Sequence, residues 1–128
     1  MRRRRYESVR LTSQLGTEGV VVHGTVRPAE RMSVGTREQL STLYRLSLAE
    51  YLGTTVVLDD QLVQSDDTRM DWFRELLVEK SARFQVVVFT CRPGDYLVPA
   101  ELVPSDGPAV RTTGAVHAVN LGRAIQRR

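Results

Sequence analysis

The most chemically informative residues are two adjacent carboxylates that follow a short apolar run. Asp59 and Asp60 come directly after Val56-Val57-Leu58, which predicts a β-strand that ends in two acids. Mg²⁺ takes one or two carboxylates together with phosphate oxygens and water. A second carboxylate can orient a water for in-line attack on a phosphorus atom. The pair therefore predicts a Mg²⁺ site for phosphate chemistry, and the alternative is two solvated acids in a strand-to-loop turn.

A second polar group follows the next apolar strand along the chain. Thr90, Cys91 and Arg92 come directly after Val86-Val87-Val88-Phe89. Ligands of open α/β sheets bind at the carboxyl ends of the strands. We therefore expect this group to lie beside Asp59 and Asp60.

A third polar group begins the longest predicted helix. Ser33-Val34-Gly35-Thr36 places exposed backbone N–H groups at a positive helix end, which is a general anion site. Ser33 adds a hydroxyl, and Gly35 lets a phosphate approach the backbone closely. The alternative is helix capping and nothing more.

Two helices and two strands must position these groups. The first helix is predicted to start at Thr36, with a capping box to Gln39, and to end at Gly53. Its expected inward face has helical spacing and comprises Leu40, Leu43, Tyr44, Ser47, Leu48 and Tyr51. The second helix is predicted over about 67–82, with Ser65 or Asp66 as its cap. The apolar strands at 54–58 and 85–90 then form a βαβ unit, which predicts an α/β fold with a parallel sheet covered by helices on both faces.

The chain is expected to divide into three parts. Residues 1–30 hold a basic N-terminus and a two-stranded hairpin of 6–11 with 19–23. Residues 31–95 hold the polar groups described above. Residues 96–128 are predicted to be rich in loops, with one candidate edge strand at 115–119 and a basic tail.

Composition narrows the function classes. The formal net charge is +3 over 128 residues, and six of the eighteen cationic residues lie in Arg2–Arg5 and Arg127–Arg128. These ends could contact a nucleic-acid backbone or could be solvated termini. No apolar run approaches the length of a membrane span. The single cysteine, Cys91, excludes an internal disulfide and fits a reducing compartment, so we expect a cytoplasmic protein without a membrane partner.

Four segments in order resemble motifs of ATP-binding-cassette ATPases, closest to the SMC-like branch of DNA repair and chromosome maintenance. Met32-Ser33-Val34-Gly35-Thr36-Arg37-Glu38-Gln39-Leu40 resembles the signature motif, and Val56 to Asp60 resembles the Walker B strand. Asp66 matches the aspartate of the D-loop, and Val86 to Arg92 resembles the strand leading to the switch histidine. The resemblance covers about 31–95.

The resemblance implies the C-terminal half of a P-loop NTPase fold and a role for each matching residue. Ser33, Gly35 and Thr36 would bind, in trans, the ATP that a partner holds. Asp59 would bind Mg²⁺ through water, and Asp60 would take the place of the catalytic glutamate. Asp66 would cross the interface of a dimer that forms through ATP.

The sequence departs from the family at three places. Asp60 is one methylene shorter than glutamate, and either Cys91 or Arg92 stands where the switch histidine is expected. Arg92 is the candidate catalytic residue of the two, because a guanidinium could supply positive charge to the γ-phosphate, although it does not titrate at neutral pH. No P-loop is present, because a P-loop needs a lysine after glycine and the one lysine, Lys80, follows Glu79. A partner lobe with a P-loop is therefore expected. The isolated chain is predicted to bind ATP weakly at most and not to hydrolyse it.

Three other classes remain as alternatives. One is an interaction domain or remnant that keeps the ATPase fold without turnover. A phosphorelay receiver would need a lysine after Thr90, and none follows. A toprim-like nuclease or primase would need a later Asp-x-Asp, whereas only Asp95 and Asp106 follow Phe89.

Overall fold

The computed structural model describes residues 7–62 and 67–126. The chain forms two compact units, Met1–Ser41 and Thr42–Arg128, which are described separately. Helix α1 (Val34–Leu52) begins in the first unit and continues into the second. Among the described helices, none has the length and apolar character needed to cross a bilayer. The three-part division expected from the sequence stays a prediction.

The first unit contains a three-stranded antiparallel sheet in the order β1-β2-β3. Its strands are β1 (Ser8–Leu11), β2 (Thr17–Val22) and β3 (Thr25–Pro28), and the short 3₁₀ helix η1 (Ala29–Arg31) follows. The expected hairpin is present, but the third strand was not predicted. His23 and Gly24 form the missed two-residue connection, with φ of 50° and 73°. Two positive φ values are what a tight hairpin turn requires, and a histidine at the first of them is an uncommon signal.

Helix α1 is capped by Ser33 and not, as predicted, by Thr36. The Oγ of Ser33 accepts the backbone N–H of Thr36 at 3.2 Å, so the helix starts at Val34. Its predicted end is confirmed. Gly53 has φ of 62°, and the N–H of Thr54 donates to the carbonyl of Ala49 at 3.1 Å, which closes the last turn.

The predicted inward face of α1 was wrong. The buried residues of the helix are Thr42, Leu46 and Ala49, whereas Leu48 is 37% exposed and Tyr51 86% exposed. Leucines occur on more than one side of this helix, so their spacing alone does not select the core face. Small side chains at 42 and 49 instead let the helix approach its neighbours closely.

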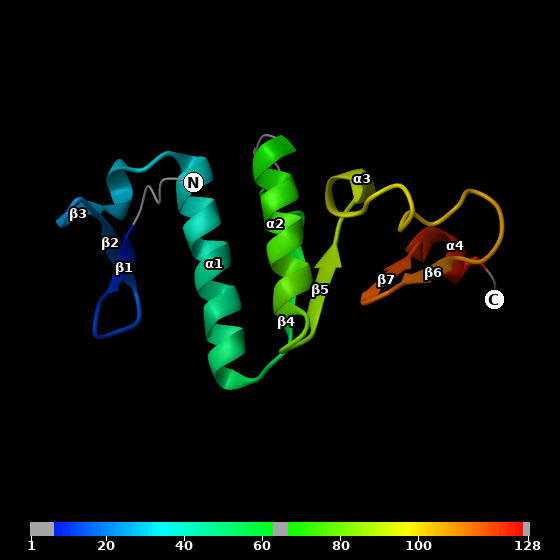
Figure 1. Cartoon of the computed structure of the whole chain (residues 1–128), viewed down its shortest axis with the longest axis horizontal. Coiled ribbons are helices and arrows are strands. Elements are labelled where there is room, and N and C mark those ends of the chain that lie inside the picture. The colour runs from blue at the N-terminus through cyan, green and yellow to red at the C-terminus, as the bar shows by residue number, and fades with distance from the viewer. Residues whose placement is uncertain (1–6, 63–66, 127–128) are drawn as a thin grey trace. The chain divides into compact units, whose positions relative to one another are not determined.

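The second unit is built on a parallel pair of strands joined by a helix (Figure 1). β4 (Val56–Asp59) pairs with β5 (Val86–Phe89), and α2 (Asp67–Lys80) connects them. Buried apolar residues from α1, α2 and the two strands share one core. Its most deeply buried members are Leu46, Leu58, Leu62 and Phe73.

The predicted α/β fold is confirmed in its mixed character, and the extent of the sheet is corrected. The parallel sheet has two strands among the described residues. Burial alternates along β4, with Val56 and Leu58 inside while Val57 is 55% exposed. Phe89 on β5 is also 48% exposed. Apolar residues on both faces of a strand normally mean cover on both faces, whereas the described residues leave Val57 and Phe89 exposed.

The C-terminal segment has more regular structure than predicted. After the short helix α3 (Pro93–Tyr96), β6 (Val110–Thr113) and β7 (Val116–Val119) form an antiparallel hairpin, followed by α4 (Leu121–Ile125). The expected edge strand corresponds to β7, and β6 was missed. The guanidinium of Arg123 donates to the carbonyls of Pro104 and Gly107, which fixes the loop before β6.

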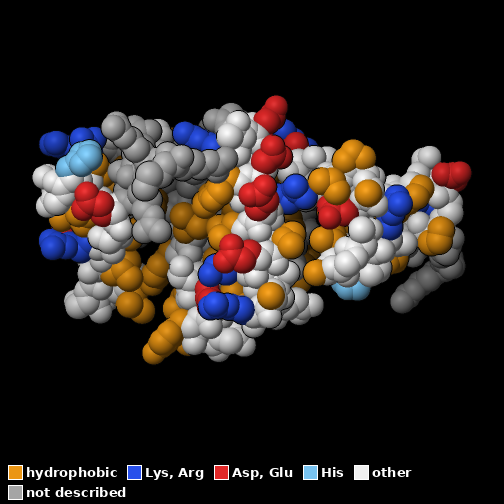
Figure 2. All heavy atoms as spheres, in the orientation of Figure 1, with side chains coloured by type: hydrophobic (Ala, Val, Ile, Leu, Met, Phe, Trp, Pro, Cys, Tyr) orange, Lys and Arg blue, Asp and Glu red, His pale blue; other side chains and the backbone are white. Residues whose placement is uncertain are grey.

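The outer face of α2 is acidic. Figure 2 shows a row of acidic side chains over this helix. The row consists of exposed carboxylates spaced four residues apart, namely Asp67, Asp71, Glu75 and Glu79. This spacing places them on one solvated side of the helix, opposite the core residues Met70, Phe73 and Leu77.

Candidate functional site

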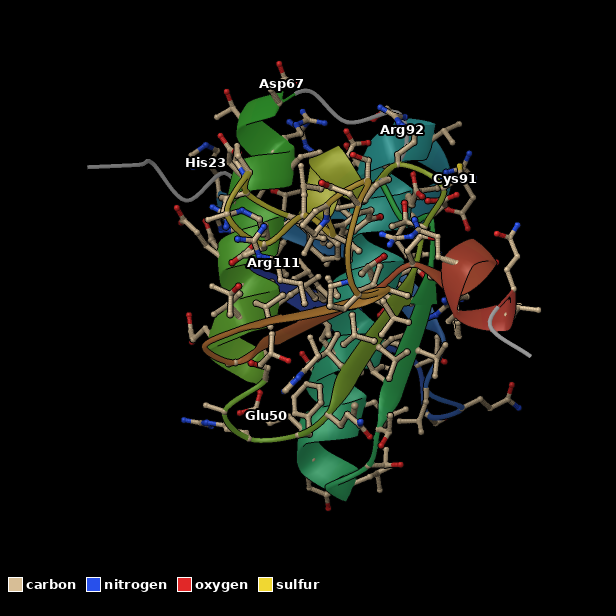
Figure 3. All side chains as sticks on the ribbon, turned by 90° about the vertical axis from the view of Figure 1, so that its right-hand side faces the viewer. His23, Glu50, Asp67, Cys91, Arg92 and Arg111 are labelled. Atoms are coloured by element: carbon tan, nitrogen blue, oxygen red, sulfur yellow. The ribbon has the colours of Figure 1, made fainter. Side chains whose placement is uncertain are left out.

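The carboxyl ends of β4 and β5 bring two predicted polar groups together. The register pairs Asp59 with Phe89, and the N–H of Asp60 donates to the carbonyl of Phe89 at 2.9 Å. Cys91 and Arg92 lie at this same end of the unit, as does Asp67 at the start of α2 (Figure 3). The expected proximity of the acidic pair to the residues after β5 is therefore confirmed.

Asp60 is held by the residue that follows the neighbouring strand. Its Oδ2 accepts the thiol of Cys91 at 3.2 Å and the backbone N–H of Cys91 at 3.4 Å. Its Oδ1 is buried, and no described residue donates a hydrogen bond to it. A buried carboxylate oxygen without a donor is costly, because it loses water without a replacement. This atom is therefore the place where a water or a ligand group would complete the site.

The backbone at Asp60 is in the left-handed region, with φ of 41°. Aspartate adopts this region more readily than most residues, because its short polar side chain bonds locally. The turn that begins here redirects the chain at the end of β4 and aims the Asp60 side chain across the strand pair. Leu62, with φ of 62°, completes the turn and is 1% exposed.

Hydrogen bonds at Asp60 change the acidity of two groups. The Thr90 hydroxyl, then the thiol and N–H of Cys91, lower the pKa of Asp60, with a smaller contribution from the charge of Arg92. Desolvation opposes this shift. In turn, the hydrogen bond to Asp60 and its negative charge raise the pKa of the Cys91 thiol. The arrangement favours an ionised acid beside a protonated thiol.

Asp59 differs from its neighbour in being exposed. Within the described part of the chain, its carboxylate has no hydrogen-bond or ion-pair partner. Its backbone carbonyl accepts the side-chain amide of Gln61 at 2.9 Å, which fixes its backbone. Alternation along β4 sends this side chain to the open face, so it can reach a hydrated cation there.

Three residues that the sequence did not single out hold the turn after β4. The side-chain amide oxygen of Gln61 accepts the hydroxyl of Thr42 on α1 at 3.2 Å. The Tyr96 hydroxyl on α3 donates to the backbone carbonyl of Gln61 at 2.6 Å. Thr42 is 1% and Tyr96 8% exposed, so both bonds are shielded from water. Sequence patterns give no sign of these contacts, because they join positions 19 and 35 residues apart.

Arg92 does not share the position of Cys91. Its guanidinium forms an ion pair with Asp95 three residues on, at 2.9 Å. Its N–H donates to the Thr90 hydroxyl at 2.9 Å. The arginine therefore contributes charge near Asp60, whereas the thiol of Cys91 donates to the carboxylate.

The three residues predicted to bind a nucleotide in trans lie at the start of α1. The hydroxyls of Ser33 and Thr36 are 2.9 Å apart, and both side chains serve the cap of the helix. Gly35 has no steric requirement for glycine, since a Cβ there would meet nothing within 4 Å. These residues belong to the first unit and are described within it. Asp66, predicted for the D-loop, lies outside the described residues.

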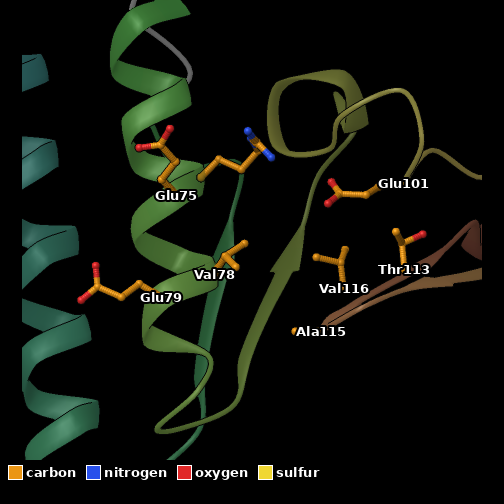
Figure 4. A pocket seen from close by; sticks show the side chains of 8 residues that line it. Glu75, Val78, Glu79, Glu101, Thr113, Ala115 and Val116 are labelled. Atoms are coloured by element: carbon orange, nitrogen blue, oxygen red, sulfur yellow. The ribbon is translucent and has the colours of Figure 1, made fainter.

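The histidines and the remaining groove do not form a second centre. His117 Nδ1 lies 3.0 Å from the hydroxyl of Thr112 in the β6–β7 hairpin. Residues 7–62 and 67–126 hold no group of three or more His, Cys, Asp or Glu side chains that could bind a metal. A shallow groove of about 430 Å³ lies between α2 and the β6–β7 hairpin (Figure 4). Its lining comprises Arg74, Glu75, Val78, Glu79, Glu101, Thr113, Ala115 and Val116, and includes no predicted site residue.

Comparison with known proteins gives a structural likeness and no match in sequence. No protein-family model matches the chain, and no curated protein matches it in sequence. A solved structure described as "Structural biochemistry of ATP-driven dimerization and DNA stimulated activation of SMC ATPases" aligns with it at a TM-score of 0.54. The chain has an SMC-like fold. The alignment covers 92% of this chain and 75% of the other at 19% identity, so the likeness concerns the fold alone.

Proposed function

We propose that this chain supplies the C-terminal half of an SMC-like ATP-binding-cassette ATPase. In this role it contributes a signature motif and two carboxylates to a composite ATP site. The main support is the carboxylate pair at the open end of β4, in which Asp59 is exposed and Asp60 keeps a buried oxygen without a donor. This pair lies on an SMC-like fold, at the edge where α/β sheets bind ligands.

The donor set fits part of a Mg²⁺ site. Mg²⁺ is held by one or two carboxylates plus phosphate oxygens and water, and need not have three protein ligands. Asp59 is the residue that would hold it, and the ion would offset negative charge on the phosphates. Asp60 would accept a hydrogen bond from the attacking water through Oδ1. Its neighbours keep it ionised, which is the state that can orient a water.

The signature role rests on Gly35. Glycine favours a helix less than alanine does, and a Cβ at Gly35 would meet nothing within 4 Å. An unhindered backbone at a helix N-terminus beside the hydroxyls of Ser33 and Thr36 suits contact with a phosphate of ATP held by another subunit. Asp66 would cross the same interface.

The phosphate cradle must come from a partner. Lys80 is the one lysine of the sequence, and its ammonium pairs with Glu50 at 2.6 Å, so it cannot serve as a P-loop lysine. The proposed partner is a P-loop-bearing lobe or subunit, and ATP would join two such assemblies. The exposed apolar side chains Val57 and Phe89 would be covered if that partner packed on this side of the strands.

DNA is a further proposed partner, in DNA repair or chromosome maintenance. The structural neighbour is described as an SMC ATPase with DNA-stimulated activation. In this chain Arg2–Arg5 and Arg127–Arg128 would supply sequence-independent contacts to phosphates. Both runs lie outside the described residues.

One observation favours the second candidate, an interaction domain without turnover. Asp60 is shorter than glutamate, one of its oxygens is buried, and the other is bonded to Cys91. A water would reach Oδ1 only after the neighbouring groups make room. In that case the chain would associate with a partner and would not hydrolyse ATP.

The test mixes the chain with a P-loop-bearing SMC-like lobe in Mg²⁺-ATP and measures association by light scattering and turnover by phosphate release. We expect ATP-dependent association, slow turnover, and accumulation of an ATP-bound dimer with Asp60→Asn. Asp71→Asn is the matched control, because it removes the same charge from an exposed site on α2. Association without turnover in the wild type would favour the interaction domain. Equal behaviour of the two variants would refute a special role for Asp60.

A further inference from the structure

The contact between Asp60 and Cys91 distinguishes two residues that the sequence left as alternatives. Cys91 donates to Oδ2 of Asp60 from both its thiol and its backbone N–H. Arg92 directs its guanidinium to Asp95 and its N–H to Thr90. We propose that Cys91 is the positioning residue of Asp60, holding Oδ2 so that Oδ1 remains as the acceptor for a water. The role of Cys91 in turnover rests on the proposed function, whereas its hydrogen bonds to Asp60 are independent of that function.

The chemistry of a thiol suits this role in one protonation state. A protonated thiol is a weak hydrogen-bond donor. A thiolate cannot donate, and its negative charge repels a neighbouring carboxylate. Asp60 raises the pKa of Cys91 through the hydrogen bond first and through its charge second. Burial raises it further, and the nearby backbone N–H and the charge of Arg92 act in the opposite direction. The thiol is therefore kept as a donor at neutral pH and is a poor nucleophile.

The strained turn explains why such a donor is needed. Asp60 has φ of 41° at the end of β4, so the side chain leaves the backbone in an uncommon direction. Contacts from the β4 side fix the turn through Gln61 and do not reach the carboxylate. On the β5 side, Cys91 is the residue that contacts the carboxylate itself.

The first experiment measures the contact in the isolated chain. Cys91 is the one cysteine of the sequence, so the rate of alkylation by iodoacetamide reports on this thiol alone. Although Cys91 is exposed, we expect the native chain at pH 8 to react about threefold or more slowly than the chain unfolded in urea. Asp60→Asn should raise the native rate about threefold or more and shift the rate–pH profile to lower pH.

Asp59→Asn is the matched control, because it removes the same charge one residue away from a side chain that does not contact Cys91. We expect its alkylation rate to stay within about 1.5-fold of the wild type, since an exposed charge is well screened. Equal effects of the two substitutions, or no effect of either, would overturn the proposed contact. If Asp60→Asn fails to fold by circular dichroism, the wild-type comparison decides, and equal native and unfolded rates overturn the proposal.

The second experiment measures the positioning role in the assembled ATPase. We expect Cys91→Ala to lower kcat about tenfold with little change in KM for ATP, because the carboxylate loses its alignment. Cys91→Ser should restore kcat to within about twofold of the wild type, since a hydroxyl can donate the same bond. Wild-type turnover in Cys91→Ala would overturn the role. An inactive wild-type assembly would refute the proposed function and the role in turnover together, and the alkylation profile would still decide the contact.

Discussion

At the scale of single residues, polar contacts across the core decide where the candidate site points. Asp60 gains its orientation from Cys91 on one side and from the turn held by Gln61 on the other. Thr42 and Tyr96, which anchor Gln61, come from two different helices. A substitution at either anchor should therefore affect the stability of the turn before it affects the rest of the core.

Tyr96→Phe tests that anchor with the smallest possible change. The ring stays in the core, but the carbonyl of Gln61 loses its donor at 2.6 Å. We expect a loss of about 1 kcal/mol in the free energy of unfolding, measured by urea denaturation. Tyr51→Phe is the matched control, because this side chain is 86% exposed and should tolerate the change. Equal midpoints for Tyr96→Phe and the wild type would show that the bond does not stabilise the turn.

Glu50 gives a prediction for pH. This carboxylate accepts the ammonium of Lys80 at 2.6 Å and pairs with Arg83, at the end of the unit opposite Cys91 (Figure 3). The hydrogen bond from Lys80 is the largest cause lowering the pKa of Glu50 below 4.5. Burial opposes the shift, whereas the Arg83 hydrogen bond and both positive charges add to it.

A folded-state pKa below the unfolded value means that the pair stabilises the fold above the unfolded pKa of about 4.5 and loses this effect as pH falls through the folded pKa. We expect Glu50→Gln to reduce the free energy of unfolding at pH 7 and to reduce its dependence on pH below 4.5. Urea unfolding at a series of pH values measures both. A variant with the wild-type slope in that range would contradict the assigned pair.

The sequence predicts where the candidate site lies better than it predicts which atoms make contact there. Acids and polar residues that end two parallel strands must meet at one edge, and Asp59 and Asp60 do meet the segment after β5. Which of Cys91 and Arg92 contacts Asp60 was not predictable, because the contact depends on side-chain directions and because Arg92 pairs with Asp95. Register fixes which strands end together, and rotamers fix which atoms touch.

At the scale of elements, two glycines differ in the space around their Cα atoms. One lies where two strands approach closely, and the other lies at an open helix end. A Cβ on Gly19 of β2 would lie 2.3 Å from the carbonyl oxygen of Arg27 on β3. A Cβ on Gly35 of α1 would meet nothing within 4 Å. The same residue type therefore has a packing role in the first case and none in the second.

The pair Gly19→Ala and Gly35→Ala tests this difference. We expect Gly19→Ala to lower the free energy of unfolding by about 1–3 kcal/mol, because the strands must separate to admit the methyl group. Gly35→Ala should be neutral or stabilising by up to about 1 kcal/mol, since alanine favours the helix. Urea denaturation followed by circular dichroism measures both. Under the proposed function, Gly35→Ala should nevertheless weaken ATP-dependent association.

The elements themselves were predicted unevenly. The two apolar strands, their connecting helix and the end of α1 at Gly53 follow from composition and spacing. The inward face of α1 did not, because small residues at Thr42 and Ala49 pack in the core while the larger Tyr51 is exposed. Residue size at the contact decides this, and a pattern of apolar spacing does not contain it.

At the scale of the whole molecule, the fold provides part of an α/β sheet and leaves some of its apolar side chains exposed. β4 and β5 are the two strands of the parallel sheet in the described chain, and Val57 and Phe89 are exposed on them. The sequence predicted cover on both faces because apolar residues occupy both sides of β4. The apolar pattern of such a strand therefore overestimates how much of it the described chain buries.

The isolated chain should therefore not act on ATP by itself. Of the two carboxylates that end β4 only Asp59 is exposed, and the sequence has no P-loop lysine, so we expect the chain not to enclose the phosphates of a nucleotide. We expect no phosphate release above background and a shift in Tm of less than about 1 °C with millimolar Mg²⁺-ATP, as for ligand at or below its Kd. Addition of a P-loop-bearing SMC-like lobe should produce a shift that requires both ATP and Gly35. Robust hydrolysis by the purified chain alone would refute the half-site, and a shift that survives Gly35→Ala would place the nucleotide away from the start of α1.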